Sequence, residues 1–414
     1  MFISSLGNPR LKCALVVFIV FILFHANKLL LFPNQFIKST NISFGLPELD
    51  ISNQELAKET DRTLTPGSTS RLAVHGQESQ TGISPDGCNV SENGGTLHSW
   101  FRFGVSDEMT SWFGPNLTFL KDTEFVINPC ELCPPDSHLD YIIVVNSAVQ
   151  HFDRRLAIRK TFGRRDIFTH MHQRVVFLLG TTLEKEISRR IITESQQYND
   201  IVQGQFLDTY QNLTLKGIAG LRWLAKFCPR ADVIIKIDDD VILNIFMVVS
   251  YVVPVFRHQY HQLLCESWPA GSKPIIRDDT NKWKVSEDQF RGLDYYPFVH
   301  CNGYFVAITG KLIRPLLEAS KVNHFFWIDD IYLYGMLART VGDVQFRKLY
   351  RFLTYDFSYA KECIIKRGLQ CTTMVLNDNN LDRADSKHFY DLWSQLTGQI
   401  TDSDRIQYHL NEYL

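Results

Sequence analysis

Short apolar runs and amphipathic stretches alternate along the chain from about residue 139 onward. The apolar runs are rich in β-branched residues and have the length of buried strands, whereas the stretches between them carry charge on one face or repeat apolar side chains at three- and four-residue steps. We predict strands at residues 141–145, 174–180, 200–202 and 233–237. We predict helices at residues 154–161, 184–198 and 213–227, the last of them ending at Cys228-Pro229.

This alternation of strand and helix favours an α/β fold with a mainly parallel central sheet and helices on both faces. In sheets of this kind, ligands bind beyond the carboxyl ends of the strands. The strand predicted at residues 233–237 runs directly into Asp238, Asp239 and Asp240. The three aspartates are therefore expected at the ligand-binding edge of the sheet.

A long apolar segment lies near the amino terminus. Residues 13–24 contain no charged side chain, Arg10 and Lys12 precede them, and the apolar run resumes at residues 29–32. Residues 13–32 are together about long enough to span a bilayer, and the positive flank would keep the short amino terminus in the cytoplasm. A cleaved signal peptide is the alternative. Either segment would direct the rest of the chain into the secretory lumen.

The composition after this segment predicts the domain organisation. Residues 33–95 are rich in small and polar residues with few aromatics, which is typical of a flexible stem. We divide the chain into a cytoplasmic tail (1–12), a transmembrane signal-anchor (13–32), a flexible stem (33–95) and a luminal domain (96–414). Four N-glycosylation sequons fit a luminal location. They begin at Asn41, Asn89, Asn116 and Asn212.

Charge and cysteine content narrow the partners and the compartment. The formal net charge is −2 and no long basic tract occurs, so nothing indicates a nucleic-acid partner. Eight of the nine cysteines lie outside the apolar segment, and this even number fits disulfides in an oxidising compartment. Cys130 and Cys133 have the CxxC spacing of a zinc or redox site. Because no second ligand pair completes such a site, we favour structural disulfides.

Three consecutive carboxylates at the end of a buried strand repel one another, which costs stability unless a cation is bound. In extended geometry Asp238 and Asp240 lie on one side of the chain and Asp239 on the other. Two carboxylates on one side can hold Mg²⁺ or Mn²⁺, with diphosphate oxygens completing the coordination shell. A solvated acidic turn or a helix cap is the alternative.

A second acidic pair, Asp329 and Asp330, lies between aromatic residues. Partial desolvation there would raise a carboxyl pKa and suit the group to general-base chemistry, although a cap for the following helix is the alternative. Residues 295–305 mix turn-forming and aromatic residues, as a sugar-stacking loop or a loop packed on the core would. Three basic residues could contact phosphate or balance the aspartates. They are Arg155, Arg159 and Lys236.

Taken in order, these segments resemble the β1,3-glycosyltransferase family of galactosyltransferases, N-acetylglucosaminyltransferases and Fringe-type relatives. The resemblance covers about residues 139–340 and rests on six motifs. They are residues 157–162 (IRxTW, with Phe162 at the usual tryptophan), 177–180 (FLLG), 200–216 (DI…DFxDxYxNLTLK, with Gln205 at an aspartate), 236–241 (KxDDDV), 302–304 (the end of GxGY, with Cys301 at the first glycine) and 329–332 (EDVY, with the glutamate shortened to Asp329).

The resemblance implies a GT-A-type fold, a UDP-sugar donor and Mn²⁺ or Mg²⁺. It also implies inverting transfer to the 3-hydroxyl of an acceptor glycan on a protein or lipid, by a single-pass type II protein of the Golgi membrane with a luminal catalytic domain. Asp330 would be the catalytic base, and Asp238 and Asp240 would bind the metal. Further donor-side contacts would be Arg155, Arg159, Lys236, Asp238 and Asp239. Further donor or acceptor contacts would be Gly303, Tyr304, Trp327 and Asp329.

Asp208, Tyr210 and Asn212, in the third motif, we interpret as mainly structural, so a buried Asn212 would escape glycosylation. Two other functions fit parts of the pattern. A metal-dependent phosphatase or nuclease would need further His and Asp clusters, which the sequence does not offer in a recognisable spacing. A non-catalytic luminal lectin or transferase chaperone would be expected to lose the metal-binding aspartates, and all three are present. We therefore favour an enzyme, a hexosyltransferase.

Overall fold

The computed structural model describes residues 107–113, 118, 125–134, 137–377 and 386–411, which all belong to one compact unit, Gln80–Leu414. The predicted tail, anchor and stem lie outside these residues, as do the sequons at Asn41, Asn89 and Asn116. None of the helices within the described ranges is long and apolar enough to cross a membrane.

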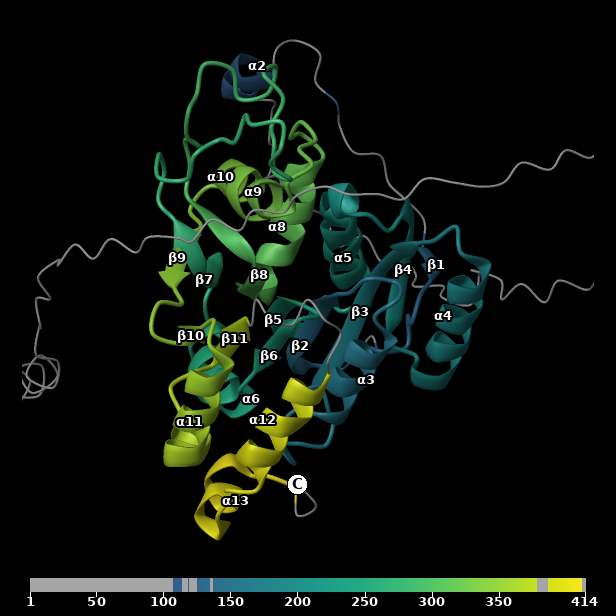
Figure 1. The fold of residues 1–414 in the computed structure, drawn as a ribbon, viewed down its shortest axis with the longest axis vertical. Coiled ribbons are helices and arrows are strands. Elements are labelled where there is room, and N and C mark those ends of the chain that lie inside the picture. Colours follow the sequence, from purple (N-terminus) through teal and green to yellow (C-terminus); the bar gives the residue numbers. More distant parts are fainter. Residues whose placement is uncertain (1–106, 114–117, 119–124, 135–136, 378–385, 412–414) are drawn as a thin grey trace, which may run out of the picture. The chain divides into compact units, whose positions relative to one another are not determined.

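Eight strands form the central sheet in the order β1-β4-β3-β2-β5-β8-β7-β9 (Figure 1). The four central strands are parallel: β4 (Ile201–Leu207), β3 (Gln173–Thr181), β2 (Leu139–Asn146) and β5 (Ala231–Asp238). Antiparallel pairing adds β1 (Phe125–Ile127) to β4, β8 (His300–Thr309) to β5, and β7 (Gln262–Trp268) to β8; β9 (Gln345–Lys348) is parallel to β7. The predicted parallel sheet is confirmed at its centre, and β7, β8 and β9 extend it.

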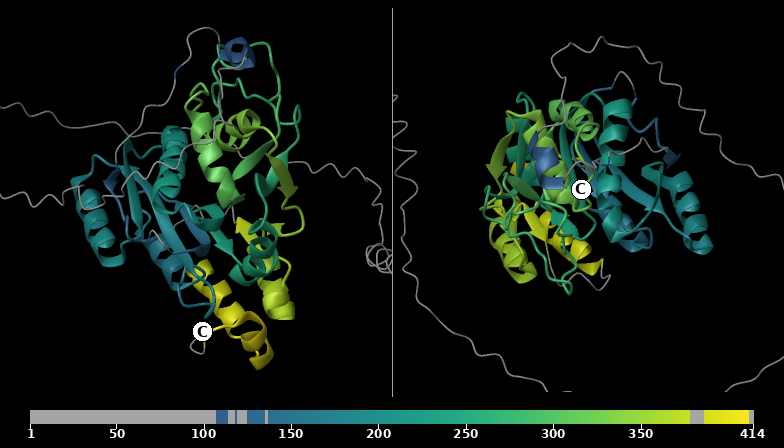
Figure 2. Two further views of the ribbon diagram at one scale, coloured as in Figure 1. Left: turned by 180° about the vertical axis from the view of Figure 1, so that it is seen from behind. Right: turned by 90° about the horizontal axis from the view of Figure 1, so that it is seen from above.

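The central strands are mainly apolar because both faces of the sheet are covered. Successive side chains point to opposite faces, so Ile143 belongs to one apolar cluster and Val144 to another. The first face is covered by α3 (Phe152–Lys160), α4 (Lys185–Tyr198) and α12 (Lys387–Thr397), and the second by α5 (Leu213–Phe227) and α8 (Gly310–Ser320). The three predicted helices are thus confirmed, and Figure 2 shows the arrangement from two further sides.

The carboxyl-terminal residues, whose role the sequence leaves open, complete the first layer. A small sheet joins β10 (Leu353–Thr354), β11 (Val375–Asn377) and β6 (Val241–Leu243), which follows the three aspartates. The remaining helices are α2 (Asp107–Phe113), α6 (Ile245–Met247), α7 (Val253–Phe256), α9 (Asp329–Ile331), α10 (Leu337–Val341), α11 (Phe357–Arg367) and α13 (Asp402–Tyr408). Short helical turns occupy Tyr210–Asn212, Val248–Val252, Tyr332–Met336 and Gly368–Gln370.

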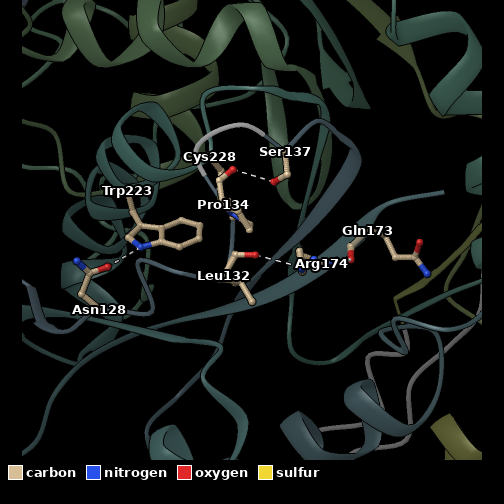
Figure 3. The surroundings of a disulfide bond; sticks show 9 residues. Asn128, Leu132, Pro134, Ser137, Gln173, Arg174, Trp223 and Cys228 are labelled. Carbon is tan, nitrogen blue, oxygen red and sulfur yellow. Dashed lines mark hydrogen bonds between the residues drawn. A yellow bond between two sulfur atoms is a disulfide. The ribbon is translucent and has the colours of Figure 1, made fainter. Parts of the chain in front are cut away.

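The described cysteines form disulfides, in agreement with the prediction, and the loops that they close range from 8 to 95 residues in sequence separation. Cys133 is bonded to Cys228, and the two other described pairs are Cys265–Cys301 and Cys363–Cys371. Around Cys228, the Trp223 indole N–H donates to Asn128 Oδ1 at 2.9 Å, and Arg174 donates to the Leu132 carbonyl at 3.1 Å (Figure 3). The first disulfide therefore fixes the end of α5 to the segment before β2.

Candidate active site

The ends of the parallel strands bring the first group of candidate residues together. Strand β5 ends at Asp238, which is paired in register with Asn146 at the end of β2. Asp239 and Asp240 form a turn, and the Asp239 N–H donates to the Asn146 carbonyl at 3.1 Å. The aspartates thus lie at the carboxyl edge of the sheet, where the sequence predicted them.

Asp239 faces inward and is fully engaged by the protein. One carboxylate oxygen accepts from Ser147 Oγ at 2.7 Å and lies 2.8 Å from His151 Nδ1, and the other accepts from Arg154 Nη1 at 2.9 Å. Burial would raise the pKa of Asp239, but the contacts with His151, Ser147 and Arg154 lower it to about 2. The structure therefore does not bring Asp239 to the donor side as predicted, because its oxygens anchor the acidic turn.

The other two aspartates of the turn, Asp238 and Asp240, are left to bind a ligand. The Asp238 side chain is 40% exposed and accepts from Lys236 Nζ at 2.6 Å. Asp240 is half-buried, and burial together with the charges of Asp238 and Asp239 raises its pKa to about 6. Lys236 is buried and also donates to the Gly303 carbonyl, which links β5 to β8 beside the acidic turn.

The second acidic pair begins α9. Burial raises the pKa of Asp329 to about 7; Lys236 opposes this rise, and the charges of Asp330 and Asp238 add to it. Burial also raises the pKa of Asp330, whose carboxylate lies 3.5 Å from Lys273 Nζ and is 16% exposed. The charge of Asp238 in the acidic turn thus affects the pKa of Asp329 in the second acidic pair.

Gly303 in β8 lets the strand approach the acidic pair closely. A Cβ at this position would lie 3.2 Å from Asp330 Cβ and 3.7 Å from Asp329 Oδ2. A side chain at this position would therefore press on Asp330, whereas its distance to Asp329 is that of an ordinary contact. The sequence predicted Gly303 as a ligand contact, and the structure places its backbone between Lys236 and the acidic pair.

The chemistry of this donor set fits a hard divalent cation. Burial first, and then the charges of Asp238 and Asp239, raise the pKa of Asp240, and carboxylate oxygens are preferred ligands of Mg²⁺ and Mn²⁺. No group of three ligating side chains in the described ranges forms a complete metal cage. Asp238 and Asp240 would thus hold the ion with oxygens supplied by a substrate or water.

Arg155 and Arg159 are engaged by carboxylates and carbonyls of the protein itself. The Arg155 side chain is completely buried and donates to both oxygens of Glu194, to Ser147 Oγ and to the Ala148 carbonyl. Arg159 binds Glu194 at 2.6 Å and both oxygens of Asp200 at 2.8 Å. Their donors are used to join α3, α4 and β4, so this arrangement gives no support to the predicted phosphate contacts.

Tyr304 and its neighbours form a network that the sequence did not reveal. Glu266 in β7 accepts from Tyr304 at 3.0 Å, from Tyr355 at 2.8 Å and from Asn302. Asn302 Oδ1 in turn accepts from Trp268 Nε1 at 2.9 Å and from Lys273 Nζ at 3.3 Å. Because Lys273 also faces Asp330, this network leads from the carboxyl-terminal residues to the acidic pair. No motif singled out Glu266 or Lys273.

The segment before α5 supports the site from the other side of the sheet. Asp208 accepts from the Gly180 N–H at 2.6 Å and from Lys216 Nζ at 3.0 Å, consistent with its predicted structural role. Asn212 is half-buried, and its amide donates to the Leu207 carbonyl at 2.8 Å. Tyr210, of the same motif, is 48% exposed.

Comparisons with known proteins match the part of the chain that contains these residues. Residues 153–348 match the Galactosyltransferase family model. The chain is 30% identical over 225 residues to beta-1,3-galactosyltransferase 1 of Mus musculus, covering 53% of this chain and 65% of the relative. It is 28% identical over 227 residues to beta-1,3-galactosyltransferase 5 of Homo sapiens, covering 54% of this chain and 70% of the relative. The chain therefore spans about two thirds of the length of these relatives.

Among solved structures, the apo structure of the WbbM bifunctional glycosyltransferase covers 63% of this chain and 45% of its own. Its TM-score is 0.31 and its sequence identity is 10%, values too low to bear on the fold.

Proposed function

Because this chain belongs to the β1,3-glycosyltransferase family, we propose that it transfers a hexose or N-acetylhexosamine from a UDP-sugar to the 3-hydroxyl of an acceptor glycan on a glycoprotein or glycolipid. The transfer would invert the anomeric carbon and form a β1,3-linkage. The observation that carries the proposal is the meeting of two acidic groups, Asp238 with Asp240 and Asp329 with Asp330, at the carboxyl edge of one sheet.

In this proposal Asp330 is the base that takes the proton from the acceptor hydroxyl. Its oxygen lies 3.5 Å from Lys273 Nζ, and the Ile331 N–H donates to its other oxygen at 2.8 Å, so the carboxylate is held in a fixed orientation. Burial raises its pKa, which brings its basicity closer to what proton transfer near neutral pH requires. Asp329 and the Gly303 backbone would border the reacting sugars.

The donor diphosphate belongs at the acidic turn. A bound Mn²⁺ or Mg²⁺ would stabilise the charge that develops on the departing UDP. Asp238 and Asp240 would hold this ion, and Lys236 keeps Asp238 in place at 2.6 Å. Asp239, bound to Arg154, Ser147 and His151, fixes the turn from behind.

We also propose that the domain works in the Golgi lumen behind an anchor at residues 13–32. The disulfides Cys133–Cys228, Cys265–Cys301 and Cys363–Cys371 support an oxidising compartment. A topology measurement would test the anchor: protease added to sealed Golgi vesicles should leave the domain intact, and digestion of the domain would contradict the proposal.

UDP release tests the activity directly. The full chain, purified in a mild detergent, should release UDP from one of UDP-galactose, UDP-N-acetylglucosamine or UDP-N-acetylgalactosamine, with Mn²⁺ and not with EDTA. Addition of a β-galactoside or N-acetylhexosaminide acceptor should raise the rate. Asp330→Asn should reduce transfer by at least about 100-fold and leave UDP–Mn²⁺ binding unchanged.

Asp343→Asn is the matched control. Asp343 is exposed, and asparagine tolerates the positive φ of 50° at this position. This control should be fully active. Normal turnover in Asp330→Asn would refute the role of the base. A folded wild-type protein that neither binds UDP–Mn²⁺ nor releases UDP from any donor would favour a non-catalytic lectin or chaperone instead.

A further inference from the structure

Two large aromatic side chains are exposed beside the acidic pair. Tyr210 is 48% exposed and Trp283 is 45% exposed, and the Trp283 indole N–H donates to the Tyr210 hydroxyl at 2.6 Å. The Trp327 ring lies edge-on to Tyr210, with 6.4 Å between the ring centroids. These three residues, which we call the aromatic platform, come from the turn before α5, the loop between β7 and β8, and the residue two positions before Asp329.

The exposure of the platform is not explained by folding. Tyrosine and tryptophan usually bury most of their apolar surface, because doing so contributes strongly to stability. Here the polar groups of Tyr210 and Trp283 satisfy each other and hold the two rings in a fixed relation. Lys282 Nζ lies 4.5 Å from the Trp283 ring centroid and 5.4 Å from that of Tyr210, an arrangement that is only weakly favourable at an exposed position. The platform is thus ordered without being buried.

Hydrogen bonds fix the platform relative to the acidic pair. Thr214, the second residue of α5, is buried. Its hydroxyl donates to the Phe326 carbonyl at 2.8 Å and to the Trp327 carbonyl at 3.0 Å. This contact joins the segment that carries Tyr210 to the segment that carries Asp329 and Asp330. In addition, the charges of these two aspartates help raise the pKa of the Tyr210 phenol, after the larger effect of burial. The segments that carry the aromatic platform and the acidic pair are therefore held next to each other.

A polar cavity lies beside one member of the platform. Its volume is about 520 Å³, and Trp327 lines it together with Lys284, Ser286 and Glu287. Partly exposed aromatic rings near hydroxyl, ammonium and carboxylate groups match the two kinds of surface of a pyranose. The C–H groups of a sugar ring carry partial positive charge and pack on the electron-rich faces of aromatic rings, while the hydroxyls at the ring edge form hydrogen bonds.

We propose that the aromatic platform is a second sugar subsite, in which the residue preceding the attacked sugar of the acceptor stacks on Trp283 and Tyr210. The acceptor is then at least a disaccharide, and its terminal residue presents the 3-hydroxyl to Asp330. This inference rests on the glycosyl transfer proposed above. A uracil base stacked at the same place would be a different occupant, and the test below separates the two.

The test compares sugars that differ only in the second residue. Saturation-transfer NMR on the full chain in detergent would measure binding of lactose against methyl β-galactoside, and of chitobiose against methyl β-N-acetylglucosaminide. At least one disaccharide should bind more tightly than its monosaccharide, with saturation of its reducing-end ring. Trp283→Ala should weaken that disaccharide roughly tenfold and remove the preference. Trp283→Phe, which keeps a ring, should retain most of the affinity.

Tyr359→Ala, which removes a 57% exposed aromatic residue from α11, is the matched control and should change nothing. UDP–Mn²⁺ binding, measured on the same samples, should be equal in wild type and Trp283→Ala. Loss of UDP binding in Trp283→Ala would assign the platform to the donor base and overturn the proposal. Absence of any disaccharide preference, or its persistence in Trp283→Ala, would also overturn it. A disaccharide preference that Trp283→Ala removes, without UDP release from any donor, would refute the transfer activity but support the sugar subsite.

Discussion

Asp239→Asn isolates the contribution of one buried charge to the acidic turn. The substitution keeps the shape of the side chain and removes its negative charge. Ser147 and His151 retain a polar partner, but Arg154, which is 8% exposed, loses its ion pair with Asp239. We expect the variant to be less stable than wild type, because removing one charge of a buried ion pair is unfavourable.

The pKa of Asp239 sets the magnitude of this loss. A carboxyl whose pKa falls from 3.8 to about 2 on folding is stabilised by about 2 kcal/mol in its ionised form. Asparagine resembles the protonated form, so about 2 kcal/mol is expected at neutral pH, and up to about 4 kcal/mol if Arg154 stays buried. Because the folded pKa is depressed, this stability is present above about pH 4 and is lost as the pH falls toward 2.

Urea unfolding followed by tryptophan fluorescence measures the effect, with disulfides intact, at pH 7 and at pH 3. The difference between wild type and Asp239→Asn should be about 2–4 kcal/mol at pH 7 and clearly smaller at pH 3. Asp153→Asn, an exposed aspartate on the same helix as Arg154, is the control and should cost less than about 1 kcal/mol. A loss below 1 kcal/mol at pH 7, or an equal loss at both pH values, would refute the reasoning.

Two further predictions concern stability. Asp329→Asn should raise the urea midpoint at pH 8 in the absence of divalent metal and have little effect at pH 4. Burial raises the folded pKa of Asp329 from 3.8 to about 7, so the wild-type fold loses stability as the pH rises between these two values. A lower midpoint of the variant at pH 8 would contradict this. Replacing Cys133 and Cys228 by serine opens a loop with a sequence separation of 95 and should lower the free energy of unfolding by roughly 4–5 kcal/mol. The same replacement of Cys363 and Cys371, with a separation of 8, should lower it by roughly 2–3 kcal/mol. Equal losses in urea unfolding would show that loop closure does not govern these bonds.

The elements that the sequence predicts best are those whose pattern reports burial directly. Strand β2 is buried along its whole length, and its middle, residues 141–145, is a continuous apolar run. Helix α5 has a clear apolar period, and its end is marked by Cys228-Pro229. The location of Asp238 followed from these elements, because a parallel strand places the residue after its last apolar position at the ligand-binding edge.

Features that depend on tertiary partners were not predictable from local pattern. Arg155 and Arg159 lie on a short basic helix and look like surface charges in the sequence, yet Glu194 and Asp200 bury and neutralise them. Residues 295–305 have the composition of a loop, but β8 begins at His300, where pairing with β7 and the bond to Cys265 outweigh the polar residues. The exposure of Tyr210 likewise depends on Trp283, a partner 73 residues away.

The pairing of β6 with β11 has a consequence for biosynthesis. Strand β6 starts immediately after Asp240, and Val241 pairs with Asn377, near the end of the chain. The ribosome makes the acidic turn long before it makes the strand that supports the following residues. A nascent chain released between residues 330 and 375 therefore carries every aspartate of the site but lacks the strand that pairs with β6. The small sheet that follows the acidic turn can form only after the carboxyl-terminal residues have been made.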